Sequence, residues 1–144
     1  MVIKKSMCCH PLRILWLFMA SILLMNGCAG IAPRIPSAPA PPTADLLDKA
    51  EQALEGGDYS RAELQVERAL RIEPRNGQAW HLMARIRYGQ INYGQTVQFC
   101  LKSNTLAGND HSLRRQNWML LEKAYTKLGD TTKAKEARDK AANL

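Results

Sequence analysis

Apolar residues between positions 46 and 74 recur at the spacing of two amphipathic helices. The positions that share this spacing are Leu46, Ala50, Ala53 and Leu54 in the first segment and Ala62, Val66, Ala69 and Leu70 in the second. Each segment therefore has one apolar stripe and one charged face. Gly56, Gly57 and Asp58 separate the segments, and Pro74 ends the second. Because alanines on facing stripes let two helices approach closely, the pattern predicts an antiparallel helical hairpin.

The same pattern occurs twice more along the chain. A shift of 34 residues places Tyr59 on Tyr93, and a further shift, four residues longer, places Trp80 on Trp118. Hairpins of this size have no core of their own and are stable only when they stack on copies of themselves. We therefore predict three stacked repeats, at about residues 44–76, 77–109 and 110–144.

At these positions the chain resembles the tetratricopeptide repeat family. Its unit has Trp or Leu, Leu, Gly or Ala, and Tyr on the first helix, then G-D-Y at the turn, with Ala and Pro in the second half. The matching residues are Gly57, Asp58, Tyr59, Ala62, Ala69, Leu70 and Pro74 in the first repeat, Trp80, Met83, Ala84 and Tyr93 in the second, and Trp118, Leu121, Tyr125, Gly129, Asp130, Ala134 and Ala141 in the third. The second repeat departs most, with Thr96 and Ser103 in place of alanines and Gly108 in place of the proline. The resemblance implies an all-α solenoid of about three helical hairpins over residues 44–144.

The first 27 residues have the parts of a bacterial export signal. A positively charged start is followed by twelve largely apolar residues, and the stretch ends in Gly27 and Cys28. This ending resembles the signal of bacterial lipoproteins. It implies removal of residues 1–27 and acylation of Cys28 by fatty acids such as palmitate, which together anchor the chain to a membrane. The alternative is an uncleaved anchor, but a spanning helix needs about 20 apolar residues.

Residues 28–43 are predicted to join this anchor to the repeats. Ala29 follows the cysteine, and in the enterobacterial sorting pattern a residue other than aspartate resembles release to the outer membrane. Five of the seven prolines of the chain lie between positions 29 and 43. Because prolines at this density prevent helices and sheets, we predict a disordered tether of polyproline-II character with a reach of about 45 Å.

Charge is unevenly distributed along the repeats. Residues 43–74 carry eight acidic and four basic side chains, whereas residues 75–144 carry five acidic and twelve basic ones. A basic half is typical of nucleic-acid binding, but here the lysines are spread around the predicted helices with no aromatic residues interleaved. An exported protein also leaves the compartment that holds nucleic acid. We therefore predict no nucleic-acid partner.

The sequence contains no pattern that predicts catalysis, a metal, a cofactor or a small-molecule substrate. His81 and His111 stand apart from any second ligand at metal-binding spacing, and there is no phosphate loop or nucleophile elbow. His111 is expected at the start of a helix that Asp110 or Ser112 caps. Cys100 falls at a core-facing position and is expected to be a small buried apolar residue rather than a reactive thiol. We predict that the protein is not an enzyme.

The tetratricopeptide resemblance also implies a binding surface, because in that family the first helices of successive repeats line a concave groove. The implied groove residues are Glu51, His81, Arg85, Tyr88, Met119, Lys123 and Lys127, with Leu82 and Leu120 beside them. The basic members would receive an acidic segment of a protein partner, and Tyr88, Leu82 and Met119 would supply apolar contacts. The alternative is that these side chains merely face solvent.

A lipid anchor, a proline-rich tether and a short repeat domain together resemble the LpoP-type lipoproteins, small tetratricopeptide proteins that activate class A penicillin-binding proteins. This resemblance implies a non-enzymatic regulator of peptidoglycan synthesis, anchored in the outer membrane with its domain in the periplasm. A pilotin-like or assembly-factor lipoprotein for an outer-membrane machine is the alternative. A cell-wall hydrolase would need paired carboxylates in a cleft, and Glu51 and Glu55 on one helix face are more simply groove charges.

Overall fold

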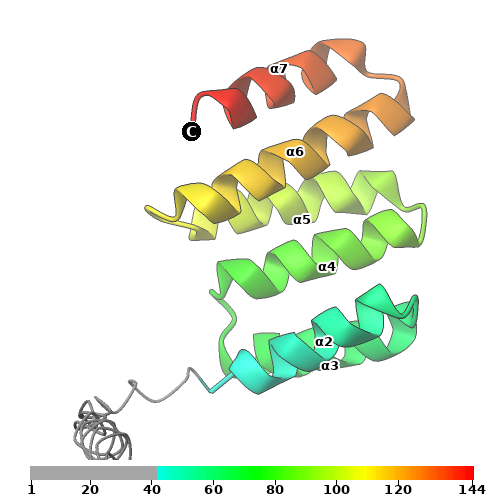
Figure 1. The fold of residues 1–144 in the computed structure, drawn as a ribbon, viewed down its shortest axis with the longest axis vertical. Helices are drawn as coiled ribbons and strands as arrows, with labels where there is room; N and C mark the ends of the chain where they lie inside the picture. Colours follow the sequence, from blue (N-terminus) through cyan, green and yellow to red (C-terminus); the bar gives the residue numbers. More distant parts are fainter. Residues whose placement is uncertain (1–41) are drawn as a thin grey trace, which may run out of the picture. The chain divides into compact units, whose positions relative to one another are not determined.

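Six α-helices and no strand make up residues 42–144, the part of the chain that this computed structural model describes (Figure 1). In chain order they are α2 (Ala44–Glu55), α3 (Tyr59–Ile72), α4 (Gly77–Gly89), α5 (Tyr93–Leu106), α6 (His111–Leu128) and α7 (Thr131–Ala142). The predicted signal, Cys28 and all but the last two residues of the predicted tether lie outside the described residues. None of the six helices combines the length and the apolar character that a membrane crossing requires.

The helices pack as three hairpins stacked in the order of the sequence. α2 packs on α3, α4 on α5 and α6 on α7, and successive hairpins meet where α3 contacts α4 and α5 contacts α6. The first helices of the hairpins also contact one another, α2 with α4 and α4 with α6. The predicted all-α solenoid of three tetratricopeptide-like repeats is therefore confirmed.

A polar side chain caps the start of five of the six described helices. Asp58, Asn76, Asn92, Asp110 and Asp130 each accept a hydrogen bond from the backbone N–H three residues further on. Such a cap satisfies an N–H that has no partner within the helix. Of the two caps considered for α6, Asp110 is the one formed, and His111 is the first helical residue, as predicted.

The three turns inside the hairpins share one backbone geometry. Gly57 and Gly129 have positive φ angles of 75° and 79°, and Ile91 has a φ of 63° at the equivalent point between α4 and α5. In each turn this residue donates its N–H to the carbonyl three residues before it, and the next N–H donates to a carbonyl five residues before its own position. These two bonds end the first helix of each hairpin through one residue in the left-handed conformation.

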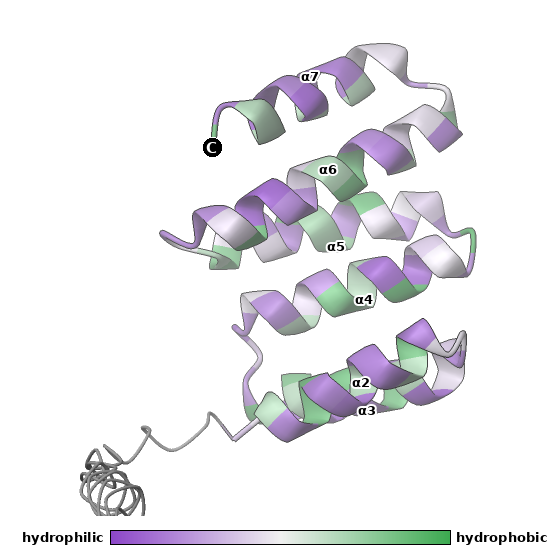
Figure 2. Ribbon diagram, in the orientation of Figure 1, coloured by the Kyte–Doolittle hydropathy of each residue, from purple (hydrophilic) through white to green (hydrophobic). Residues whose placement is uncertain are grey.

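Buried alanines hold the helices close together. Ala50 and Ala84, which a shift of one repeat aligns, are both fully buried, as are Ala62 and Ala69 on α3. The core cluster between the first two hairpins contains Ala50, Ala53, Ala62, Val66, Ala79, Leu82, Met83 and Ile86, and a second cluster, which spans the last two, contains Ala84, Cys100, Leu121 and Ala137. α7 is largely hydrophilic, and its buried residues are all alanines (Figure 2).

Cys100 belongs to the second cluster and is the single cysteine among the described residues. Its side chain is fully buried, as predicted. Burial disfavours the thiolate and raises the pKa of the Cys100 thiol to about 12. Since the thiolate is the reactive form, the cysteine acts as a packing residue at neutral pH.

Two contacts lock the first hairpin onto α4. The ring of Tyr59 lies against Gly89, where a Cβ atom would stand 2.3 Å from a ring carbon, so a larger residue at position 89 would displace the ring. Arg87 donates to both carboxylate oxygens of Glu63. These charge-assisted hydrogen bonds hold the pKa of Glu63 below its usual range. The hairpins are thus joined by specific polar and steric contacts as well as by alanine packing.

Candidate partner-binding surface

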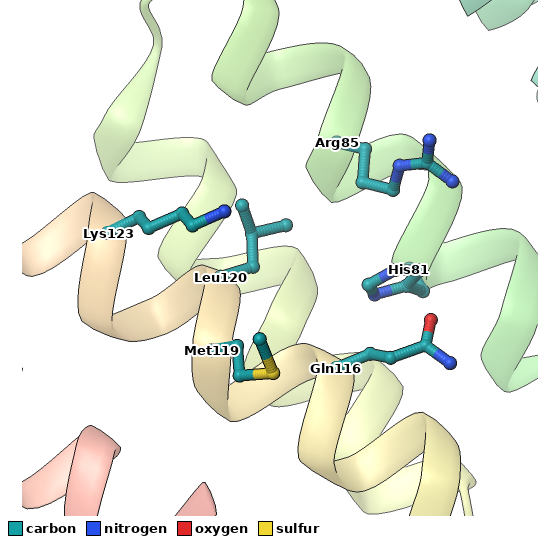
Figure 3. A pocket seen from close by; sticks show the side chains of 6 residues that line it. All are labelled: His81, Arg85, Gln116, Met119, Leu120 and Lys123. Carbon is teal, nitrogen blue, oxygen red and sulfur yellow. The ribbon is translucent and has the colours of Figure 1, made fainter.

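A depression of about 230 Å³ lies between α4 and α6, the first helices of the second and third hairpins (Figure 3). Its lining side chains are His81 and Arg85 from α4 and Gln116, Met119, Leu120 and Lys123 from α6. Four of the seven predicted groove residues thus come together at one place. Gln116 was not predicted, although its position one helical turn before Leu120 on the same face of α6 is a signal that could have found it.

His81 forms part of the floor of this depression rather than an exposed contact. Its side chain is only 4% exposed, and its Nδ1 lies 2.7 Å from Oδ1 of Asn117. Asn117 in turn donates to Ser103, and the Ser103 hydroxyl donates to the carbonyl of Gly77. This chain of hydrogen bonds connects α6, α5 and α4. His81 therefore lines the depression, but its ring is held in a buried network and offers little exposed surface to a partner.

Burial keeps His81 neutral, and the network determines which ring nitrogen carries the proton. Burial disfavours the charged imidazolium, so the pKa of His81 is lowered from its ordinary value despite the hydrogen bond to Asn117. Because the Asn117 amide nitrogen donates to Ser103, its oxygen is free to accept, and Nδ1 of the neutral ring carries the proton. At neutral pH the floor of the depression is therefore uncharged.

Arg85 and Glu51 form an ion pair that joins α4 to α2. Both side chains are partly exposed, at 32% and 42%. The two residues occupy the same position of successive repeats, and Lys123 occupies that position in the third. One face of the stack thus presents an acid, a base and a second base in order. Glu51 neutralises part of the charge of Arg85, so the predicted acid-to-base gradient is real but softened at its centre.

Lys123 and Lys127 are the unpaired cations of this surface. Both are exposed on α6, four residues apart on one face, and neither has a carboxylate partner among residues 42–144. Exposed Met119 stands beside them, 48% accessible. We refer to the depression together with Lys127 as the first-helix surface. It combines unpaired positive charge with apolar side chains at its edge.

Two other predicted groove residues lie elsewhere. Leu82, expected as an apolar contact, is 1% exposed and belongs to the core between the first two hairpins, so that expectation is wrong. It shares the buried stripe of Met83 and Ile86 and turns away from α6. Tyr88 does not line the depression. Its ring packs against Tyr93, with centroids 5.4 Å apart, near the turn that holds Ile91.

A second depression, of about 450 Å³, was not predicted. It opens between α3 and α5 over the exposed side of α4, and its lining residues are Glu67, Leu70, Arg71, Trp80, Met83, Arg87 and Phe99. Trp80 and Phe99 pack with ring centroids 5.5 Å apart, and the indole N–H of Trp80 donates to the carbonyl of Pro74. The sequence gives no periodic signal for this depression because it arises where α3 and α5 do not meet.

No group of three or more histidine, cysteine, aspartate or glutamate side chains capable of holding a metal ion occurs within residues 42–144. The described residues thus form a helical-repeat domain with a surface depression lined by first helices.

Comparison with solved structures finds a domain of similar fold and sequence. The chain aligns with the globular C-terminal domain of P. aeruginosa LpoP at 33% sequence identity and a TM-score of 0.67, and the alignment covers 70% of this chain and 95% of that domain. No protein-family model matches the chain, and no curated protein matches it. The identity and coverage show that the chain belongs to the LpoP family.

Proposed function

We propose that this chain is a non-enzymatic regulator that activates a class A penicillin-binding protein. The observation that carries the proposal is the likeness to LpoP, which extends over nearly the whole of the LpoP domain at 33% identity. The architecture implied by the sequence, an acylated Cys28 and a proline-rich tether ahead of a repeat domain over residues 44–144, supports the same assignment. The protein would act from the outer membrane, with its domain in the periplasm.

The first-helix surface is the proposed contact for the synthase. Lys123 and Lys127 offer unpaired charge to an acidic segment, and Met119 offers an apolar contact next to them. Arg85 can join by sharing its guanidinium between Glu51 and a partner carboxylate, since a guanidinium has five N–H donors. Of the predicted groove residues, these are the ones with exposed functional groups at a shared site.

Activation requires that the regulator bind the active conformation of the synthase more tightly than the resting one. A partner that bound resting and active synthase equally well would shift nothing, however tight the complex. The regulator thus needs a surface, not a catalytic group. Its effect would appear as faster glycan polymerisation or crosslinking by the synthase at saturating regulator.

The test is a charge reversal on the first-helix surface. The full-length chain with Lys123→Glu and Lys127→Glu, purified in detergent, should lose most of its binding to the class A penicillin-binding protein of the same bacterium. It should also lose most of its stimulation of glycan synthesis. Both side chains are exposed, so the circular dichroism spectrum and Tm should be retained.

A matched control reverses the same amount of charge elsewhere. Arg68→Glu with Lys102→Glu changes two exposed cations on α3 and α5, the second helices, and neither residue has an ion-pair partner among the described residues. This variant should bind and stimulate like the wild type. Equal losses in both variants would show a general charge effect rather than a defined site. Recovery of a secretin, instead of a synthase, by crosslinking in the native envelope would favour the pilotin-like alternative.

A further inference from the structure

Ile91 is the only non-glycine residue with a positive φ angle between residues 42 and 144. Its counterparts in the other two hairpins are Gly57 and Gly129. In the left-handed region the Cβ atom of an ordinary residue approaches a backbone oxygen, and a β-branched side chain is the least tolerated there. One of three equivalent turns therefore carries a strained residue where the other two carry glycine.

The backbone of the turn gives no reason for an isoleucine. The N–H of Ile91 donates to Tyr88 and the N–H of Asn92 donates to Arg87, at 3.0 and 2.9 Å. The glycine turns make the same two hydrogen bonds, at 3.0 and 2.9 Å after α2 and at 3.2 and 3.0 Å after α6. Glycine would form this turn without strain. The side chain is thus the one feature that distinguishes position 91.

Packing gives no reason for it either. Ile91 is 72% exposed, the highest value among the exposed large apolar residues of the described chain. A side chain that is strained and exposed weakens the isolated domain without returning buried area. Strained residues of this kind cluster at catalytic and binding sites, where the strain serves the function.

The turn lies on the edge of the stack at which α6, the helix that carries Lys127, also ends (Figure 1). Ile91 lies three residues after Tyr88 and two before Tyr93, and the rings of these two tyrosines pack together. The turns after α2, α4 and α6 lie along one edge of the stack in Figure 1, so the last turn of α6, with Lys127, ends on the same edge. Ile91 therefore places an exposed apolar side chain on the edge at which the charged first-helix surface ends.

We infer that Ile91 is an apolar contact residue for the penicillin-binding protein, inserted into an apolar recess of a segment whose carboxylates face Lys127. This inference rests on the proposed function and deepens it. A protein is favoured over a bilayer because the neighbouring turns carry the carboxylates of Asp58 and Asp130, which an anionic membrane repels. An exposed apolar anchor within a charged rim is a common form of protein contact.

The test uses the opposite effects of strain and contact. In the full-length chain, Ile91→Asn and Ile91→Gly should raise the Tm by about 4–8 °C, because both residues accept the left-handed conformation. The same variants should bind the purified penicillin-binding protein about tenfold more weakly. Ile91→Val keeps a branched apolar side chain and should keep both the lower Tm and the binding. A purely structural role for Ile91 does not produce a protein that is more stable and binds less.

Leu101→Gln is the matched control, because it removes another exposed apolar side chain, on α5, from a helical position. It should leave binding unchanged. Wild-type affinity in Ile91→Asn, or a lower Tm in that variant, would overturn the inference while leaving the proposed function intact. Absence of binding by the wild-type chain would overturn both the inference and the proposed function. This measurement comes before any variant is made. Loss of vesicle flotation or of self-association in Ile91→Asn, with synthase binding retained, would assign the side chain to another occupant and also overturn the inference.

Discussion

Fully buried alanines set the distance between helices in this fold. Ala69 has no exposed surface and lies where α3 meets its neighbours, so its methyl group is all that the space accepts. Close approach of this kind tolerates neither volume nor charge. The alanines are therefore the residues at which single substitutions are expected to be most damaging.

Ala69→Asp should lower the free energy of unfolding by about 3–5 kcal/mol, since it places an unpaired carboxylate in a closed interface. Against a total stability of about 5–15 kcal/mol for a typical domain, the variant would be largely unfolded or close to it. Thermal unfolding followed by circular dichroism measures the effect. Arg68→Asp, at the exposed position next to it, should change the Tm little. An Ala69→Asp protein that melts like the wild type would contradict the register of the hairpin.

His81 gives stability a pH dependence. Its pKa in the folded state lies below the ordinary histidine value, so the unfolded chain binds more protons in the interval between the two pKa values. The free energy of unfolding should therefore fall as the pH is lowered from about 6.5 toward the folded pKa, and level off below it. Urea unfolding between pH 7.5 and 5 measures the slope. His81→Gln should flatten it, whereas His111→Gln, at the exposed start of α6, should not.

At the scale of elements, Asn76 links three segments. Its side-chain oxygen accepts from the N–H of Ala79 and caps α4, while its amide nitrogen donates to Thr43, before α2, and to Glu73, after α3. Thr43 is fully buried, and the Asn76 amide supplies its hydroxyl with a hydrogen-bond partner. One side chain thus fixes the entry of the first hairpin against the start of the second.

Asn76→Ala should cost about 1–3 kcal/mol, because the helix cap and two further hydrogen bonds are lost together. Asn92→Ala removes a cap that makes a single side-chain bond to the N–H of Gln95, and should cost only about 1 kcal/mol. Urea denaturation of the two variants compares them. Equal losses would mean that the bonds to Thr43 and Glu73 contribute nothing.

The hairpins could be predicted because their signals are local. Alanine spacing, the Gly-Asp turns and Pro74 act within a few residues of where they stand. The side of α4 that faces the core could not be predicted from such local signals. Leu82 and His81 follow Trp80 immediately, and only packing against neighbouring helices decides that both turn inward. The ion pair of Glu51 with Arg85 could have been predicted, since equivalent positions of successive repeats are neighbours in a solenoid.

At the scale of the whole molecule, the anchor determines where the domain can act. Cys28 lies outside the described residues, and its acylation remains a prediction from the sequence. Cys28→Ala should abolish labelling by a fatty-acid analogue in growing cells and move the protein from the membrane to the soluble fraction, because no acyl chain then holds it. Persistent labelling of the variant would mean that another residue is acylated. Cys100→Ala is the control and should remain labelled, since that thiol is buried in the domain.

The ordered run of Glu51, Arg85 and Lys123 belongs to a larger separation of charge. Residues 43–74 are acidic and residues 75–144 are basic, so the domain has a permanent electric dipole along its stack. In the field of an acidic partner this dipole turns the domain before the surfaces touch, and productive encounters become more frequent. The consequence is kinetic. Raising the ionic strength should slow association steeply while leaving the lifetime of the finished complex nearly unchanged, because screening acts on the approach more than on the closed contact.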